Sequence, residues 1–132
     1  MARGVTIAEL LAAFAAAITS VFDGSDWAVW PQPPDQTAVP AVWPELSSSS
    51  TGASPTSAAT VAVRVVAAIA PKTSAAEYSA IADAHDRLDQ IKSPANGVAI
   101  AGRQAFLDQV DIGQIPHTAL MYVFTVDRPR PC

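Results

Sequence analysis

The sequence is poor in charge, and this scarcity limits the kind of protein that it can encode. Only 15% of its 132 residues are charged, whereas soluble domains average about 25%. A surface with so little charge is typical of a subunit in an assembly and less suited to a solitary domain. The length fits a single domain, residues 1–132, that buries a core of its own.

Cysteine and glycine are scarce as well. The one cysteine, Cys132, excludes an internal disulfide and any metal site built from several thiols. The six glycines are dispersed, so the chain has neither a phosphate-binding glycine loop nor a dinucleotide-binding fingerprint, and it lacks a nucleophile elbow. These absences predict a protein that is not an enzyme and that has no catalytic residue, cofactor or metal.

Basic residues are few and scattered. The chain has eight lysines and arginines and a formal net charge of −4. Binding to nucleic-acid phosphates requires basic side chains that are grouped on one surface. A module that grips DNA is therefore not expected, whereas a mildly acidic protein can let DNA slide past without holding it.

A long hydrophobic run is missing too. The apolar stretch Leu10–Ile18 is shorter than the roughly 20 residues that span a bilayer. It follows Arg3 and so resembles the apolar region of an export signal. However, Thr6–Glu9 forms a capping box, and apolar residues recur at helical spacing through Phe22, which favours a structural helix. We expect no membrane contact, with a cleaved leader as the alternative.

The patterns that the sequence does contain predict two helices and a small sheet. Helices are expected over Thr6–Phe22 and Ser74–Lys92, each beginning at a capping box. Shorter extended pieces are expected over residues 27–31 and 38–44, where prolines indicate the edge of a sheet. Three segments rich in β-forming residues are expected to be strands: Ala59–Ala70, Ala105–Ile112 and Thr118–Val126.

The connections complete this fold. Turn chemistry near Gly113 and Pro116 predicts a hairpin of the last two strands. Residues 47–57, with the sequence SSSSTGASPTS, are expected to form a flexible loop. The prediction is an α+β domain, with a small, mostly antiparallel sheet and two helices packed on one face.

The strand over residues 60–70, TVAVRVVAAIA, is apolar on both faces. If both helices cover one face, the other is left bare, and bare apolar faces usually mark interfaces. The alternative is that the proline-rich segment covers this second face. The expected subunit interface consists of five residues: Ala62, Val66, Ala68, Met121 and Val123.

Few residues suggest chemistry. His85 and Asp89 lie four apart on one helix and could share a metal ion, but His85 also falls on the apolar stripe, where we expect it to pack at the margin of the core. Asp108 and Asp111 lie three apart on a strand and so point to opposite faces, which argues against a catalytic pair. The sequence therefore favours structural roles for these side chains.

Three tryptophans lie among the prolines. Trp27, Trp30 and Trp43 could form an aromatic platform for a sugar or a proline-rich partner. The alternative is that they anchor the proline-rich segment to the first helix. We expect this anchoring role for Trp43, and the sequence leaves the roles of Trp27 and Trp30 open.

The order of these elements resembles the tail terminator proteins of siphoviruses, especially those of phages that infect actinobacteria. The resemblance rests on the amphipathic N-terminal helix, the proline-flanked segment Val39–Pro44, the serine-rich loop and the valine-rich strand. A capped second helix and a terminal hairpin that ends in Asp127–Pro129 follow. The resemblance extends over nearly the whole chain.

The resemblance implies a structural role in the virion tail. It implies a homo-oligomeric ring, six subunits in number, that caps the tail tube, ends its polymerisation and joins it to the head connector. Its partners would be further copies of the chain, the tail tube protein and the head–tail connector protein, with DNA only passing through the lumen. Assembly would take place in the host cytoplasm.

Three alternatives remain open at this point. The first is another ring-forming neck or head–tail connector protein. The second is a secreted domain that binds ligands through Trp27 and Trp30, which requires that the N-terminal segment be cleaved. The third is a small enzyme built around His85.

Overall fold

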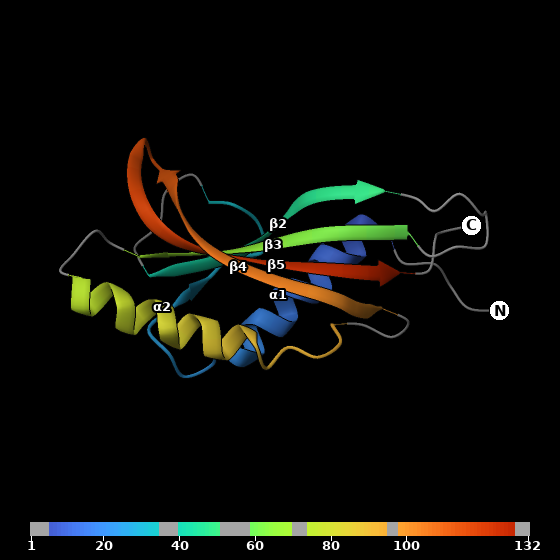
Figure 1. Cartoon of the computed structure of the whole chain (residues 1–132), viewed down its shortest axis with the longest axis horizontal. Helices are drawn as coiled ribbons and strands as arrows, with labels where there is room; N and C mark the ends of the chain where they lie inside the picture. The colour runs from blue at the N-terminus through green and yellow to red at the C-terminus, as the bar shows by residue number, and fades with distance from the viewer. Residues whose placement is uncertain (1–5, 35–39, 51–58, 70–73, 95–97, 129–132) are drawn as a thin grey trace.

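The computed structural model describes residues 6–34, 40–50, 59–69, 74–94 and 98–128 (Figure 1). Two helices, α1 (Ile7–Val21) and α2 (Ser74–Leu88), pack on one face of a five-stranded sheet. The strands are β1 (Ala28–Val29), β2 (Ala41–Ser50), β3 (Ala59–Ile69), β4 (Ala99–Ile112) and β5 (Ile115–Arg128). Their spatial order is β1-β2-β3-β5-β4, antiparallel except for β1 with β2. The predicted α+β fold is confirmed.

Helix α1 begins and packs as its sequence predicts. The Thr6 hydroxyl accepts a hydrogen bond from the Glu9 backbone N–H at 3.1 Å, which satisfies one of the free donors of the first turn. Leu10, Phe14 and Ile18 recur every four residues and are fully buried against the sheet. Beyond the helix, Gly24 adopts a φ of +76°, which glycine reaches at little cost.

Helix α2 ends at Leu88, four residues before the predicted end at Lys92. The next backbone bonds run from Gln90 to Arg87 and from Ile91 to Leu88, so the chain tightens into turns. An arginine of β4 binds two carbonyl oxygens at this end of the helix, a tertiary contact that the local pattern does not reveal. The side chains of the predicted capping box at residues 74–77 lie outside the described ones.

The expectation of a flexible loop over residues 47–57 is wrong for its first four residues. Ser47–Ser50 belong to β2, which pairs with β3 as far as Ser50 opposite Thr60, with a register shift between Leu46 and Ser48. Pairing with β3 satisfies the backbone N–H and C=O groups of the serines, and this pairing does not depend on their side chains. The polar composition therefore did not prevent a strand here. Residues 51–58 lie outside the described residues.

The last two strands form a long hairpin. Gly113 and Gln114, with φ of 59° and 67°, make the two-residue turn that matches the twist of a hairpin. The predicted strands are confirmed, but β4 begins six residues earlier than predicted, at Ala99. Pro116 lies within β5 and not in the turn. Figure 1 shows the tip of this hairpin curling away from the helix layer.

The main core lies between the helices and the sheet. Helix α1 contacts β1 and β2, and α2 contacts β3 and β5. At its centre the Phe14 and Phe124 rings lie 5.1 Å apart, and Phe124 lies 4.7 Å from Tyr122. Arg87 of α2 donates to the Val21 carbonyl oxygen at 2.8 Å and so joins the end of α1 to α2.

A second, smaller core fills part of the opposite face. Val66 and Trp43 lie side by side there, and Ile112 from the hairpin tip packs against the same cluster. The curled hairpin thus covers apolar surface that we expected to be bare or to lie under the proline-rich segment. The buried members are Ala41, Trp43, Val66, Ala68, Ile112, Ala119 and Met121.

This second core changes the picture of the expected interface. The strand register places all five predicted residues on one face, with Val66 opposite Met121. Val66, Ala68 and Met121 are buried within the single chain and so are not available to a neighbour, whereas Ala62 and Val123 are half-buried. The same face also carries the ion pair of Arg64 and Glu45, in which Arg64 Nε lies 2.6 Å from Glu45 Oε1.

Candidate functional site

Strand β4 forms one edge of the sheet and is the least covered of the long strands. It spans 14 residues, pairs with β5 on one side, and is exposed from Arg103 through Gln109. Its helix-side residues Ala105 and Leu107 stay exposed because α2 packs mainly over β3 and β5. An edge strand presents unpaired N–H and C=O groups to any other strand that approaches.

The hairpin turn shows which backbone groups of β4 are free. Ile112 and Ile115 flank the two-residue turn and therefore form a hydrogen-bonded pair. Counting back in steps of two, the even-numbered residues of β4 bond to β5, and the backbone groups of Arg103, Ala105 and Leu107 point outward. The Gln109 N–H, also outward, is bound by the Asp108 carboxylate at 2.8 Å.

The two edges of the sheet differ. Strand β4 contains no proline, so each of its outward residues keeps its donor. At the opposite edge, β1 covers Ala41 and Val42, and the Val42 carbonyl oxygen accepts from Trp30 N–H at 2.9 Å. The backbone of Pro44 faces the outer edge as that of Val42 does, and proline has no N–H to donate to another strand. The outer edge of β2 is therefore open only from Leu46 onward.

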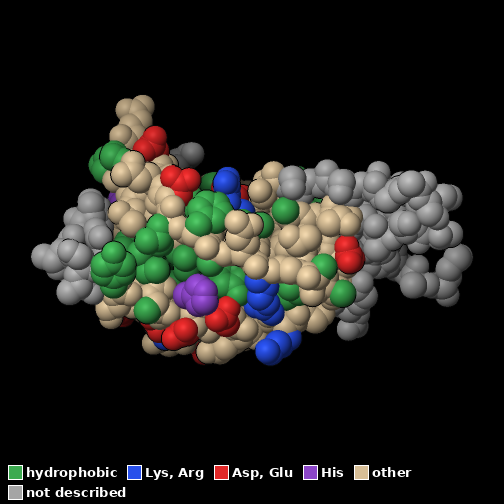
Figure 2. Space-filling view, in the orientation of Figure 1, with side chains coloured by type: hydrophobic (Ala, Val, Ile, Leu, Met, Phe, Trp, Pro, Cys, Tyr) green, Lys and Arg blue, Asp and Glu red, His purple; other side chains and the backbone are tan. Residues whose placement is uncertain are grey.

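Exposed apolar side chains accompany the open edge. The exposed fraction is 39% for Phe106 and 50% for Leu107, which point to opposite faces of β4. Tyr78 of α2 and Ile115 at the hairpin tip are also exposed. Figure 2 shows hydrophobic side chains gathered over the half of the molecule that holds α2 and the tip of the hairpin. Such clustering is typical of an interaction surface.

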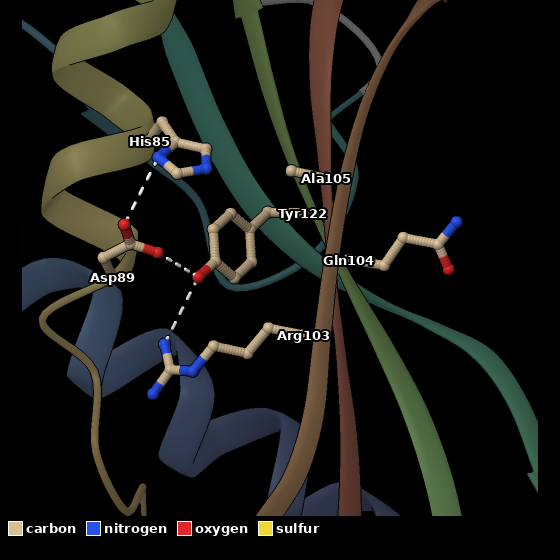
Figure 3. Close-up of a pocket in the computed structure, with 6 residues that line it drawn as sticks. All are labelled: His85, Asp89, Arg103, Gln104, Ala105 and Tyr122. Atoms are coloured by element: carbon tan, nitrogen blue, oxygen red, sulfur yellow. Dashed lines mark hydrogen bonds and ion pairs between the residues drawn. The ribbon is translucent and has the colours of Figure 1, made fainter.

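A polar pocket of about 180 Å³ lies between the end of α2 and β4 (Figure 3). The Tyr122 hydroxyl donates to the Asp89 carboxylate and accepts from Arg103 at 3.3 Å. The His85 Nδ1 lies 3.3 Å from the other Asp89 oxygen, and its ring packs 5.4 Å from the Tyr122 ring. Gln104 points away from these side chains.

The pocket ties α2 to the hairpin. The Arg103 guanidinium also donates to the carbonyl oxygens of Leu88 and Ile91, where the negative end of the helix dipole favours a cation. Burial raises the pKa of the Tyr122 phenol, the hydrogen bond to Asp89 raises it further, and the nearby Arg103 opposes the shift. The Tyr122 phenol therefore keeps its proton in the folded protein to a higher pH than in the unfolded chain.

The side chains near the pocket include three potential metal ligands. Atoms of His85, Asp86 and Asp89 that could bind a metal ion lie within 4.8 Å of one another, as the spacing of His85 and Asp89 predicts. Asp89 is occupied by Tyr122 and His85, and both aspartates are exposed, a common arrangement without any ion. Among the six residues that line the pocket there is no serine, cysteine or lysine nucleophile.

The other candidate residues do not gather into a site. Asp108 and Asp111 point to opposite faces, as predicted from their spacing. Trp27 packs on Phe22 at 5.3 Å and is the tryptophan that anchors its segment to α1. The expectation that Trp43 does so is wrong, because Trp43 lies on the other side of the sheet. Trp30 is partly exposed.

Sequence reasoning singled out His85 and Asp89 of the pocket, but it missed Arg103 and Tyr122 there and the residues of the open edge. The run Phe106–Leu107 breaks the alternation of a half-buried strand, since it places an apolar side chain on each face. Together with the absence of proline, this was a signal for an uncovered edge. The contacts of Arg103 and Tyr122 join segments far apart in the chain, and no local pattern reveals them.

The comparisons with protein families and with curated proteins identify no relative of this chain. The chain matches no protein-family model, and no curated protein matches it. In the described part of the chain, neither helix has the length and apolar character needed to cross a membrane.

Proposed function

We propose that the protein is a structural subunit that associates with further copies of itself through the open edge of β4. The observation that carries the proposal is the seven-residue exposed stretch from Arg103 to Gln109, which has outward donors, no proline and the exposed Phe106 and Leu107. Proteins that remain monomeric usually blunt such an edge. Among the described strands, β1 and Pro44 block most of the edge of β2, whereas on β4 only the Gln109 N–H is bound, by the Asp108 carboxylate.

A ring is the form of assembly that we propose. The two edges of the sheet are different surfaces, and contacts between different surfaces repeat from copy to copy until they close into a ring or extend as a filament. The resemblance to siphovirus tail terminators suggests a ring of six subunits that sits on the tail tube, ends its growth and binds the head connector. The net charge of −4 per copy suits a lumen through which DNA passes.

The first test is whether the purified chain forms rings. We expect light scattering at micromolar concentration to give a mass of several subunits, and negative-stain images to show closed rings. A monomer throughout the concentration range would overturn the proposal.

The second test concerns the place of the ring in the virion. Added to the tail tube protein of the same genome during polymerisation, the protein is expected to bind the tube end and to shorten the tubes. Rings that bind the connector but leave tube length unchanged would favour another neck protein. Bovine serum albumin at the same concentration serves as the control.

A further inference from the structure

We infer that β4 pairs with the outer edge of β2, from Leu46 to Ser50, in the next copy, and that α1 of that copy covers the bare helix side of β4. This inference rests on the proposed self-association and names the surface of the neighbour that the edge accepts. Within the described strands, two other edges are not covered by a strand, namely β2 beyond Pro44 and β1, and β1 has only two residues.

Strand direction and face agree with this pairing. Strand β2 runs antiparallel to β3, β3 to β5, and β5 to β4, so β4 and β2 are themselves antiparallel. Neighbouring copies of like orientation would thus pair in the more stable, antiparallel manner. The outward residues Ala105 and Leu107 of β4 and Leu46 of β2 all carry their side chains on the helix side. The joined sheet would keep its helices in one layer.

The helix layer decides between this neighbour and a two-fold pairing of β4 with β4. Strands lie about 4.8 Å apart in a sheet, and packed helices lie about 8–10 Å apart. With the β2 edge as partner, α2 and the incoming α1 would be separated by about two and a half strands, or about 12 Å. With β4 as partner, the two α2 helices would stand about 19 Å apart. The two-fold arrangement would leave Ala105 and Leu107 of both copies uncovered.

Side-chain chemistry fixes the alignment. With Leu46 of one copy beside Ala105 of the other, apolar side chains meet on the helix side, and Ser47 lies near Gln104 on the opposite face. Shifting the strands by two residues in one direction would bring Glu45 opposite Asp108, two like charges that repel each other across a strand pair. Shifting them by two residues in the other direction would place the apolar Leu46 beside the charged Arg103. Leu46 is 43% exposed in the single chain, which leaves it free to make this contact.

Cross-linking between single-cysteine variants tests the pairing. Leu46→Cys and Ala105→Cys are each made in a Cys132→Ser background, and both replace exposed side chains, so folding should be retained and is checked by circular dichroism. A short bis-maleimide reagent is expected to give a cross-linked dimer only when the two variants are mixed. Ile115→Cys, at the exposed hairpin tip, replaces Ala105→Cys in the control mixture.

The outcomes separate this inference from the proposed function. A cross-linked dimer of Ala105→Cys alone would show two-fold β4 pairing and overturn the inference. Oligomers by light scattering without a link between positions 46 and 105 would also overturn it, while the proposed self-association would stand. A monomer at every concentration would overturn both.

Discussion

Phe106 and Met121 lie directly opposite each other on β4 and β5, yet 39% of Phe106 is exposed and only 4% of Met121. The boundary of the second core therefore runs between these two strands. Met121 is enclosed by the curled hairpin tip and its neighbours on β3, whereas Phe106 stands at the rim of the sheet. The apolar surface that the chain leaves uncovered lies at the edge formed by β4 and not across the sheet's second face.

Proline substitutions in β4 are expected to have opposite consequences at neighbouring positions. Leu107→Pro removes an outward N–H and no bond to β5, so the fold should persist while assembly is lost. Phe106→Pro removes an N–H that bonds to β5 and is expected to lower the free energy of unfolding by more than about 1 kcal/mol. Light scattering and urea unfolding of the two variants separate these effects. Equal destabilisation by both would mean that the outward orientation is wrong.

Aspartate substitutions on the second face are expected to divide the five predicted interface residues. Val66→Asp places a charge in the second core and is expected to prevent folding, since an unpaired buried charge costs several kcal/mol. Val123 is half-buried and lies opposite Arg64, so Val123→Asp should leave the helical circular dichroism intact. A well-folded Val66→Asp protein would contradict the second core.

Trp43 provides a test of the packing in that core. Its indole Nε1–H is buried and finds no acceptor among the described residues, so replacing the ring by phenylalanine forfeits packing but no hydrogen bond. Trp43→Phe is expected to cost about 1 kcal/mol, and Trp43→Ala about 3–5 kcal/mol, in urea unfolding. A Trp43→Phe protein as unstable as Trp43→Ala would indicate that the N–H has an acceptor.

The raised pKa of Tyr122 predicts a loss of stability in alkaline solution. The unfolded phenol titrates near 10.0, and the folded one above it, so the folded protein holds the proton more tightly. This contribution is fully present below pH 10 and is lost as the pH rises through the folded pKa. Urea midpoints should fall more steeply above pH 10 for the natural chain than for Tyr122→Phe. Parallel profiles for the two proteins would contradict the linkage.

The sequence predicted those elements whose patterning is local. The capping box at Thr6, the valine-rich β3 and the hairpin were all recognisable, because spacing and turn chemistry act over a few residues. At the early end of α2 lie contacts with Arg103 and Tyr122, which reach the helix from another part of the chain. The serines of β2 are held in a strand by the backbone of β3 despite their polar composition. The curl of the hairpin, which buries Val66, follows from sheet twist and long-range packing.

Amide hydrogen exchange at Arg103, Ala105 and Leu107 tests most directly whether the β4 edge is the site of assembly. Measured by nuclear magnetic resonance in dilute and in concentrated protein, these three amides are expected to exchange freely when the chain is monomeric. They should become protected as copies associate, while the amide of Ile115 at the exposed hairpin tip exchanges at the same rate in both samples. Free exchange of the three amides in samples that scatter light as oligomers would show that the chain assembles through another surface.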